Sequence, residues 1–177
     1  MKKTVIAIVV LLLIGGALFA VFNAKDNYDA SRYFAKVTPE EKGLSVGVRI
    51  DFKLPDQFDK AHSLSDDTRI VIFSFAKKTG HTVRNFLKSR PDDYLSGHHA
   101  MFVADISPMP TIIRNAFALP DLKKSAFSVL LIYDPAIAAK FRNDAKKDQI
   151  CIVKLDHKKV TDIRYINGEE ALKKAID

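Results

Sequence analysis

The sequence feature that most constrains the fold is a strand, a tight turn and a helix in direct succession. Residues 69–76, Arg-Ile-Val-Ile-Phe-Ser-Phe-Ala, form a nearly continuous apolar run, which is typical of a strand buried on both faces. The turn Thr79-Gly80-His81-Thr82 comes next, and apolar residues then recur at helical spacing at Val83, Phe86 and Leu87. This spacing predicts a helix over about 80–90 that begins at the turn, with Thr79 as its N-cap.

The same segment resembles the active-site region of thioredoxin-fold proteins. In that superfamily the strand ends in an aromatic-Ala-x-x sequence and the turn reads Cys-x-x-Cys. Phe75-Ala76-Lys77-Lys78 matches the approach, whereas Thr79 and Thr82 stand at the two cysteine positions. A redox dithiol depends on a thiolate stabilised at a helix N-terminus, which exchanges with a disulfide. A threonine hydroxyl forms no disulfide, so the resemblance implies the fold without its usual redox activity.

Two further segments carry the resemblance. Residues 54–60, Leu-Pro-Asp-Gln-Phe-Asp-Lys, followed by His-Ser-Leu-Ser, are similar to the stretch before the first core strand of peroxiredoxins and membrane-anchored thiol-disulfide oxidoreductases, with Asp59 replacing the usual glycine. Residues 126–133 resemble the third core strand, which most thioredoxin-like proteins precede with a cis-proline facing the active site. The matching residue is Phe127, and because cis peptide bonds are a proline feature, we expect a trans bond there.

The resemblance implies an α/β fold, a thioredoxin-like three-layer sandwich in which a mixed central sheet has helices on both faces. The remaining elements follow from periodicity and turn signals. They are strands over 44–52, 101–105 and 128–133, a helix with apolar residues Ile112, Ile113, Ala116 and Phe117 that Pro120 ends, a short helix carrying Ile137 and Phe141, a hairpin of strands 149–155 and 160–166, and a closing helix after Asn167-Gly168.

The N-terminus has the pattern of a signal anchor. Lys2 and Lys3 precede an uncharged apolar run from Val5 to Phe22, close to the ~20 residues that cross a bilayer as a helix. We therefore predict a transmembrane helix over 1–23, a cytoplasmic N-terminus by the positive-inside rule and a domain on the periplasmic or extracytoplasmic side. The alternative is a cleaved signal peptide and a secreted domain, although such peptides have a shorter apolar region.

Between the anchor and the domain, residues 24–43 are mixed and charged. We interpret them as a linker, followed by a single thioredoxin-like domain over 44–177. Subtracting Lys2 and Lys3 from the 28 basic side chains leaves 26 against 21 acidic ones, a net charge of +5. This charge is modest and shows no basic stripe interleaved with aromatic residues, so the sequence does not indicate a nucleic-acid binder.

Cofactor and metal sites have little support in the sequence. The seven glycines are dispersed, without a phosphate-binding loop. Cys151, the only cysteine, lies in the apolar run Ile150-Cys151-Ile152-Val153 and is most simply a buried small hydrophobe; a reactive or dimer-forming thiol is the alternative. His98-His99 is the only histidine pair, and it has no cluster of other ligands beside it. We therefore expect neither a cofactor nor a metal.

The first functional hypothesis is a redox-inactive, membrane-anchored protein-binding or assembly module. Its groove would be shaped by the degenerate site, namely Lys78, Thr79, Gly80, His81, Thr82 and Phe127, and basic residues nearby would favour an acidic partner. The second hypothesis is an enzyme, with non-redox chemistry at Thr79 and His81 or thiol chemistry at Cys151. The third is an accessory subunit of a membrane complex, for which the Gly16-x-x-x-Ala20 spacing would allow close helix packing.

Overall fold

The computed structural model describes residues 28–177 together with Ile6, Val9, Val10 and Gly16. The predicted transmembrane run from Val5 to Phe22 therefore lies almost wholly outside the described residues. Among those that are described, no helix is long and apolar enough to cross a membrane.

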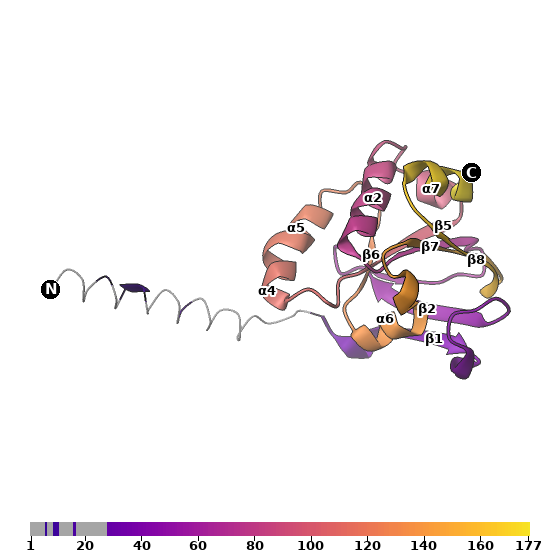
Figure 1. Cartoon of the computed structure of the whole chain (residues 1–177), viewed down its shortest axis with the longest axis horizontal. Coiled ribbons are helices and arrows are strands. Elements are labelled where there is room, and N and C mark those ends of the chain that lie inside the picture. Colours follow the sequence, from indigo (N-terminus) through magenta and orange to yellow (C-terminus); the bar gives the residue numbers. More distant parts are fainter. Residues whose placement is uncertain (1–5, 7–8, 11–15, 17–27) are drawn as a thin grey trace.

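The described chain alternates strands and helices (Figure 1). In order the elements are η1 (Ala30–Arg32), β1 (Phe34–Thr38), η2 (Glu40–Lys42), β2 (Arg49–Pro55), β3 (Ala61–Ser63), β4 (Ile70–Ser74), α2 (Lys77–Lys88), α3 (Tyr94–Gly97), β5 (Ala100–Asp105), α4 (Thr111–Ile113), the π-helical turn η3 (Arg114–Ala118), α5 (Leu119–Leu122), β6 (Leu130–Ile132), α6 (Pro135–Phe141), η4 (Asp144–Lys146), β7 (Ile150–Asp156), β8 (Lys159–Ile166) and α7 (Glu169–Ile176).

One mixed sheet organises the described part of the domain. Its strand order is β1-β2-β8-β7-β4-β5-β6, and β3 pairs with β2 beside this path. Strands β4, β5 and β6 run parallel, whereas β7 is antiparallel to both β4 and β8. All five residues of β4 are buried, as the apolar run 69–76 predicts for a central strand.

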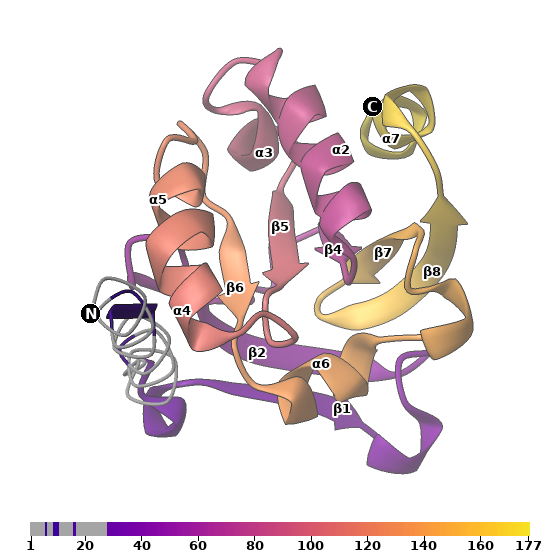
Figure 2. The ribbon, with the colours of Figure 1, turned by 60° about the vertical axis from the view of Figure 1, so that its left-hand side comes forward.

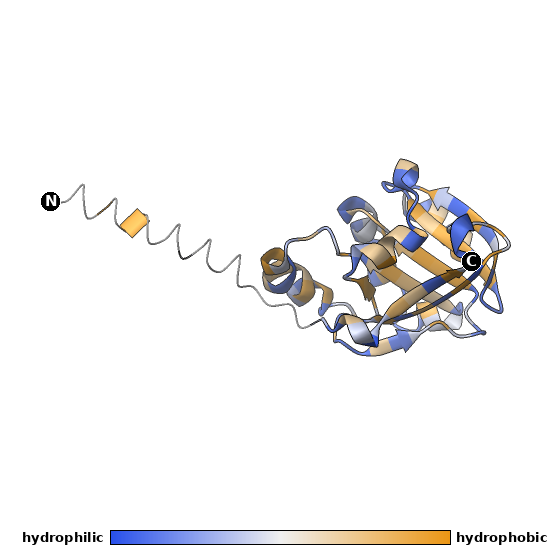
Figure 3. Cartoon of the chain, turned by 90° about the horizontal axis from the view of Figure 1, so that it is seen from below, coloured by the Kyte–Doolittle hydropathy of each residue, from blue (hydrophilic) through white to orange (hydrophobic). Residues whose placement is uncertain are grey.

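The pleat of β4 divides the interior into two cores. Successive side chains of a strand point to opposite faces, so Ile70 and Ile72 pack with α2 and α7, whereas Val71 and Phe73 pack with α6 and β2. Figure 2 shows α2 and α7 on one side of β4 and β7, with α6 and the β1–β2 pair at the other. Hydrophobic residues concentrate on these strands (Figure 3). The mixed sheet with flanking helices agrees with the predicted fold class.

Several predicted boundaries are wrong. The range 24–43, interpreted as a linker, contains β1, whose residues Phe34 to Thr38 pair with β2, because Ala35 and Val37 alternate inward and are buried. The folded domain thus begins before residue 44. The strand predicted over 44–52 is β2 at Arg49–Pro55, and Val46 lies outside it, 62% exposed.

Pro120 does not end the helical segment after β5. The chain continues through η3 into α5, with Pro120 in the first turn of α5. Proline lacks an N–H, and its ring clashes with the carbonyl of residue i−4 in a regular helix. The π-helical turn just before it, in which the Leu119 N–H bonds to the Arg114 carbonyl, widens the helix at this point. Proline is also favoured in a first helical turn.

Candidate functional site

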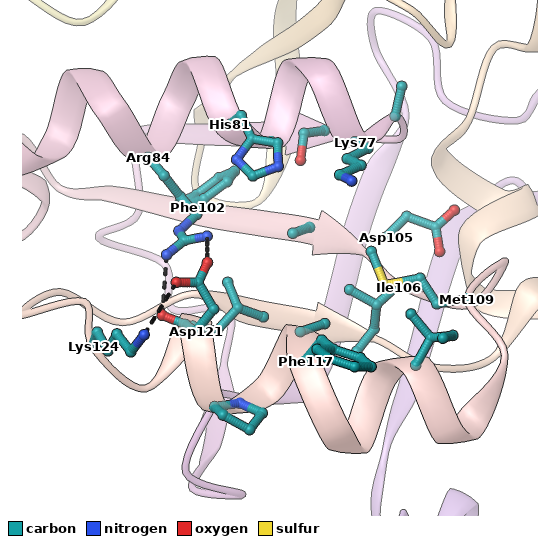
Figure 4. Close-up of a pocket in the computed structure, with 18 of the residues that line it drawn as sticks. Lys77, His81, Arg84, Phe102, Asp105, Ile106, Met109, Phe117, Asp121 and Lys124 are labelled. Atoms are coloured by element: carbon teal, nitrogen blue, oxygen red, sulfur yellow. Dashed lines mark hydrogen bonds and ion pairs between the residues drawn. The ribbon is translucent and has the colours of Figure 1, made fainter.

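A cleft lies between α2 and the α4–η3–α5 segment. It has a volume of about 640 Å³, and its floor is formed by Ser74 of β4 and by Phe102 and Ala104 of β5. One lip carries Lys77 and His81 of α2, and the other carries the α4–α5 segment (Figure 4). The walls of this second lip are apolar and comprise Ile106, Met109, Ile113, Ala116, Phe117, Ala118, Pro120 and Leu122.

The first turn of α2 differs from the prediction. The helix begins at Lys77, and its N-cap is Ala76 rather than Thr79. Thr79 is the third helical residue, where its hydroxyl donates to the Ala76 carbonyl at 2.8 Å and accepts from the Ala76 N–H at 3.4 Å. This side chain is 4% exposed. The hydroxyl therefore holds the strand-to-helix turn together and does not face the cleft.

The next three residues, predicted as a turn, lie inside α2. Gly80 and His81 line the cleft, and a Cβ at Gly80 would lie 3.4 Å from Ser74 Oγ, so glycine allows α2 to pack closely on β4. The Thr82 hydroxyl donates to the Lys78 carbonyl at 3.1 Å. His81 is exposed, as is Lys78, which does not line the cleft. Of the predicted groove residues on α2, the structure thus brings Gly80 and His81 to the cleft.

Phe127 lies away from this site. It precedes β6, and β6 runs parallel to β5 and β4 with Leu130 opposite Val103. Parallel strands begin at the same sheet edge, so Phe127 lies at the edge opposite the start of α2, where it is buried. The Phe127 carbonyl accepts from Gln57 Nε2 at 2.9 Å, and Gln57 Oε1 accepts from the Val129 N–H at 2.8 Å.

The third core strand is therefore β7 and not residues 126–133. Strand β7 is antiparallel to β4 and pairs Cys151 with Phe73, which places Gln149 beside the end of β4 where α2 begins. The position that the resemblance assigned to a cis-proline thus belongs to Gln149. Among the described residues the cis peptide bond is Thr38–Pro39, so the bonds before Phe127 and Gln149 are both trans.

An ion pair closes one end of the cleft. Arg84 of α2 donates through Nη1 to Asp121 Oδ2 at 2.7 Å and through Nη2 to the Asp121 carbonyl at 3.1 Å, as Figure 4 shows. The Arg84 side chain is 8% exposed, and both of these hydrogen bonds go to Asp121 of α5. The hydrogen bond from Arg84 lowers the pKa of Asp121, and the charges of Lys124 and Lys88 act in the same direction.

A buried carboxylate lies at the other end. Asp105 ends β5, and its side chain is fully buried. Oδ1 accepts from the Ser107 N–H at 2.9 Å and from Ser107 Oγ at 2.6 Å, while Oδ2 lies 3.7 Å from Arg142 Nη1 without a hydrogen bond. Burial raises the pKa of Asp105, although the Ser107 hydrogen bonds and the Arg142 charge oppose it. A smaller recess of about 380 Å³ lies beside Arg142 and is lined by Phe75, Ala76, Pro108, Arg142, Asp144, Lys147 and Asp148.

Cys151 is a core residue. Its side chain is fully buried in the core that contains Phe73 and Phe141. Burial raises the pKa of the thiol to about 12, although the Tyr165 hydrogen bond and Lys146 oppose the shift. A thiol in this state contributes almost no thiolate at neutral pH, so the thiol-enzyme alternative finds no reactive group at this position.

The histidine pair does not form a site either. His98 and His99 lie in the turn between α3 and β5, where the His98 ring contacts the Tyr94 carbonyl and Asp177. Within the part of the chain that the structure describes, no group of three or more His, Cys, Asp or Glu side chains is arranged to hold a metal ion.

Sequence reasoning missed the second lip of the cleft. Ile113 and Phe117 belong to the apolar stripe predicted for this helix, yet they are 44% and 67% exposed. The partnership of Arg84 with Asp121 was also missed, because the two residues are 37 positions apart in the chain. No sequence signal pairs them.

Comparison with known proteins identifies the fold. No protein-family model matches the sequence, and no curated protein does. A crystal structure described as a thiol:disulfide interchange protein DsbE from Chlorobium tepidum matches with a TM-score of 0.51 at 17% identity, covering 75% of this chain and 96% of the other.

Two further solved structures align less closely. One is described as a protein disulfide isomerase from Bacteroides thetaiotaomicron (TM-score 0.49, 17% identity, 75% of this chain and 86% of the other). The other is peroxidoxin BcpB from Mycobacterium tuberculosis (0.45, 20%, 76% and 92%). The fold assignment rests on the Chlorobium tepidum structure. The chain therefore has a thioredoxin-like fold, carried by a sequence with a single, buried cysteine.

Proposed function

We propose that this chain is a membrane-anchored, extracytoplasmic thioredoxin-fold protein that performs no dithiol chemistry and binds a segment of a partner protein in the cleft between α2 and α4–α5. The observation that carries the proposal is the cleft itself. It is a recess of about 640 Å³ with mostly apolar walls and a few polar groups at its rim, which is the usual character of a binding pocket.

The side chains at the degenerate site support binding over chemistry. The hydroxyls of Thr79 and Thr82 both bond to the backbone of α2, and a hydroxyl nucleophile needs an adjacent base. His81 is exposed at the rim, two positions along the helix from the buried Thr79. Neighbouring positions on a helix point in different directions, so these two residues do not form a nucleophile and base pair.

The charges at the rim indicate the chemistry of the partner. Lys77 and Lys124 line the cleft, and both are exposed. Asp121, the acidic residue on the same rim, is held by Arg84. We therefore propose that the partner presents apolar side chains flanked by acidic ones, since complementary charges raise association rates and select among partners.

Site-specific photo-cross-linking tests the proposal. A photoreactive amino acid replaces His81 in the full chain, which is expressed in its native membranes and irradiated. We expect a discrete cross-linked protein whose yield falls in a Lys77→Glu background. The matched control is Lys173→Glu, an exposed lysine of α7 that does not line the cleft, and it should leave the yield unchanged. An equal fall in yield for the two variants, or no fall for either, would contradict a specific cleft.

The redox part of the proposal has its own assay. Purified chain should reduce no insulin disulfides and consume no peroxide, because the sequence has one cysteine and it is buried. Either activity at a rate above the buffer control would overturn the proposal.

The proposed location rests on the sequence alone. Lys2, Lys3 and the apolar run that follows predict an anchor with the domain outside the cytoplasm. Extraction of membranes at alkaline pH should leave the chain in the membrane pellet. The accessory-subunit alternative is tested by Gly16→Leu. Under that alternative the variant would be released from its complex, because the small residue permits close packing of helices in the bilayer. Under the cleft proposal, the cross-link at position 81 persists in this variant.

A further inference from the structure

We infer that the α4–η3 lip of the cleft, formed by Ile113 and Phe117, docks on the surface of the membrane that holds the N-terminal segment. The inference rests on the membrane anchor of the proposed function. Its first observation is exposure: Phe117 is 67% exposed, the highest value among the large apolar side chains that the structure describes, and Ile113 is 44% exposed. The two residues lie about one turn apart and line the same cleft. A helical segment with such a face lies readily in the membrane interface.

The second observation is the path of the chain. Tyr28 is the first residue of the continuous range 28–177 that the structure describes. Its ring stacks on Tyr133 with ring centroids 4.7 Å apart. The Arg114 guanidinium lies over the same Tyr133 ring, 4.9 Å from its centroid. Arg114 is the first residue of η3, the turn that carries Phe117. In Figures 1 and 2 the indigo start of the described chain lies on the same side of the domain as α4.

The length of chain before Tyr28 limits the distance to the bilayer. The predicted apolar run ends at Phe22, six residues before Tyr28. A fully extended chain of that length spans at most about 20 Å. With the proposed anchor, the membrane interface would lie within about 20 Å of Tyr28, and the α4–η3 lip is an exposed apolar surface next to that point.

The surrounding side chains suit a lipid surface. Tyr28 and Tyr33 stack with centroids 5.4 Å apart, and tyrosine is enriched at membrane interfaces. Lys123 and Lys124 follow α5 and are exposed, and basic side chains near a membrane are attracted to anionic headgroups. Asp121, the acidic residue beside them, is paired with Arg84. The docked domain would turn its cleft towards the bilayer, so that the bound segment belongs to a membrane protein.

The test measures the depth of Phe117 in protein-free vesicles. The full chain is reconstituted into phosphatidylcholine vesicles containing phosphatidylglycerol, and a polarity-sensitive dye is attached to Phe117→Cys. Cys151 does not compete for the dye because it is fully buried. The matched control is Val46→Cys, which is 62% exposed and lies in the loop between β1 and β2, away from α4 (Figure 2).

We expect the dye at position 117 to shift to shorter wavelength and to be quenched by lipid-borne spin labels several-fold more than the dye at 46. Ile113→Cys should behave like Phe117→Cys. Both sites are exposed, so the labelled variants should retain the wild-type circular dichroism spectrum, which is recorded for each.

Three results would overturn the inference. If the chain floats with the vesicles but position 117 is as water-exposed as 46, the lip does not dock, while the anchor stands. If quenching appears in native membranes and not in protein-free vesicles, the lip binds a protein. If the chain fails to float at all, the proposed anchor is wrong and the docking inference is wrong with it.

Discussion

The Thr79→Cys, Thr82→Cys double variant tests the assignment of the degenerate site. The two residues are three positions apart on α2, and standard helix geometry places their Cα atoms about 5 Å apart. This separation lies inside the ~4.4–6.8 Å range of disulfides. We therefore expect an intramolecular 79–82 disulfide to form under oxidising conditions and to be reversed by reductant.

The structure also sets the stability of each redox state. Thr79 makes two hydrogen bonds with the Ala76 backbone, and their loss should lower the free energy of unfolding of the reduced variant by about 1–2 kcal/mol. Closing a four-residue loop lowers the entropy of the unfolded chain, which is worth about 2 kcal/mol. The oxidised variant should therefore unfold within about 1 kcal/mol of wild type, and the reduced variant should be less stable than either.

Urea unfolding with and without reductant measures the difference, and mass spectrometry after alkylation identifies the bond. The single variants Thr79→Cys and Thr82→Cys control for disulfides between molecules, and the buried Cys151 should stay unmodified in folded protein. If the two new cysteines alkylate independently under oxidising conditions and never pair, positions 79 and 82 are not one helical turn apart. The match of Thr79 and Thr82 to the two cysteine positions would then be wrong.

Three further predictions follow from buried groups. Gln57→Leu should lower the free energy of unfolding by about 3 kcal/mol, because the Phe127 carbonyl and the Val129 N–H lose their hydrogen bonds to Gln57. Gln149→Leu, at a partly exposed position, is the matched control. Equal losses of stability in the two variants would contradict the role of Gln57. Cys151 should resist alkylation in native protein at pH 8 and react fully in denaturant, given its burial and a thiol pKa raised to about 12; rapid native reaction would show an accessible thiol. Burial raises the pKa of Asp105 above 3.8, so the folded state binds the proton more tightly than the unfolded state does. The free energy of unfolding should therefore rise as the pH falls from above the folded-state pKa towards 3.8. Thermal melts of Asp105→Asn over the same pH range should lack this rise.

The central elements of the fold were predictable from local patterns. The apolar runs at 69–76 and 150–153 correspond to β4 and β7, and the stripe at Val83, Phe86 and Leu87 corresponds to α2. These elements lie in the middle of the sheet, where burial on both faces imposes a strong hydrophobic pattern. The apolar pattern of these segments therefore indicates their burial.

The predictions failed where pairing over long distances decides the structure. An apolar stretch such as 128–133 carries no information about its neighbour, so its identification as the third core strand was wrong, and with it the placement of Phe127. Similarly, the strand β1 is recognisable once β2 lies beside it. The α2 boundary was missed because threonine suits two positions at a helix start. At the N-cap its hydroxyl accepts from an N–H of the first turn, whereas inside the first turn the Thr79 hydroxyl donates back to the Ala76 carbonyl.

The amino-acid sequence alone determined that this chain has no intramolecular dithiol, since it contains one cysteine. It also determined the succession of strand, turn and helix on which the resemblance rests. Only the tertiary structure decided where a binding surface lies. Ile113 and Phe117 have the same four-residue spacing as Val83 and Leu87, yet the first pair is exposed and the second is buried. A hydrophobic stripe indicates that a helix has an apolar face. Whether that face is buried depends on which distant segments pack against it.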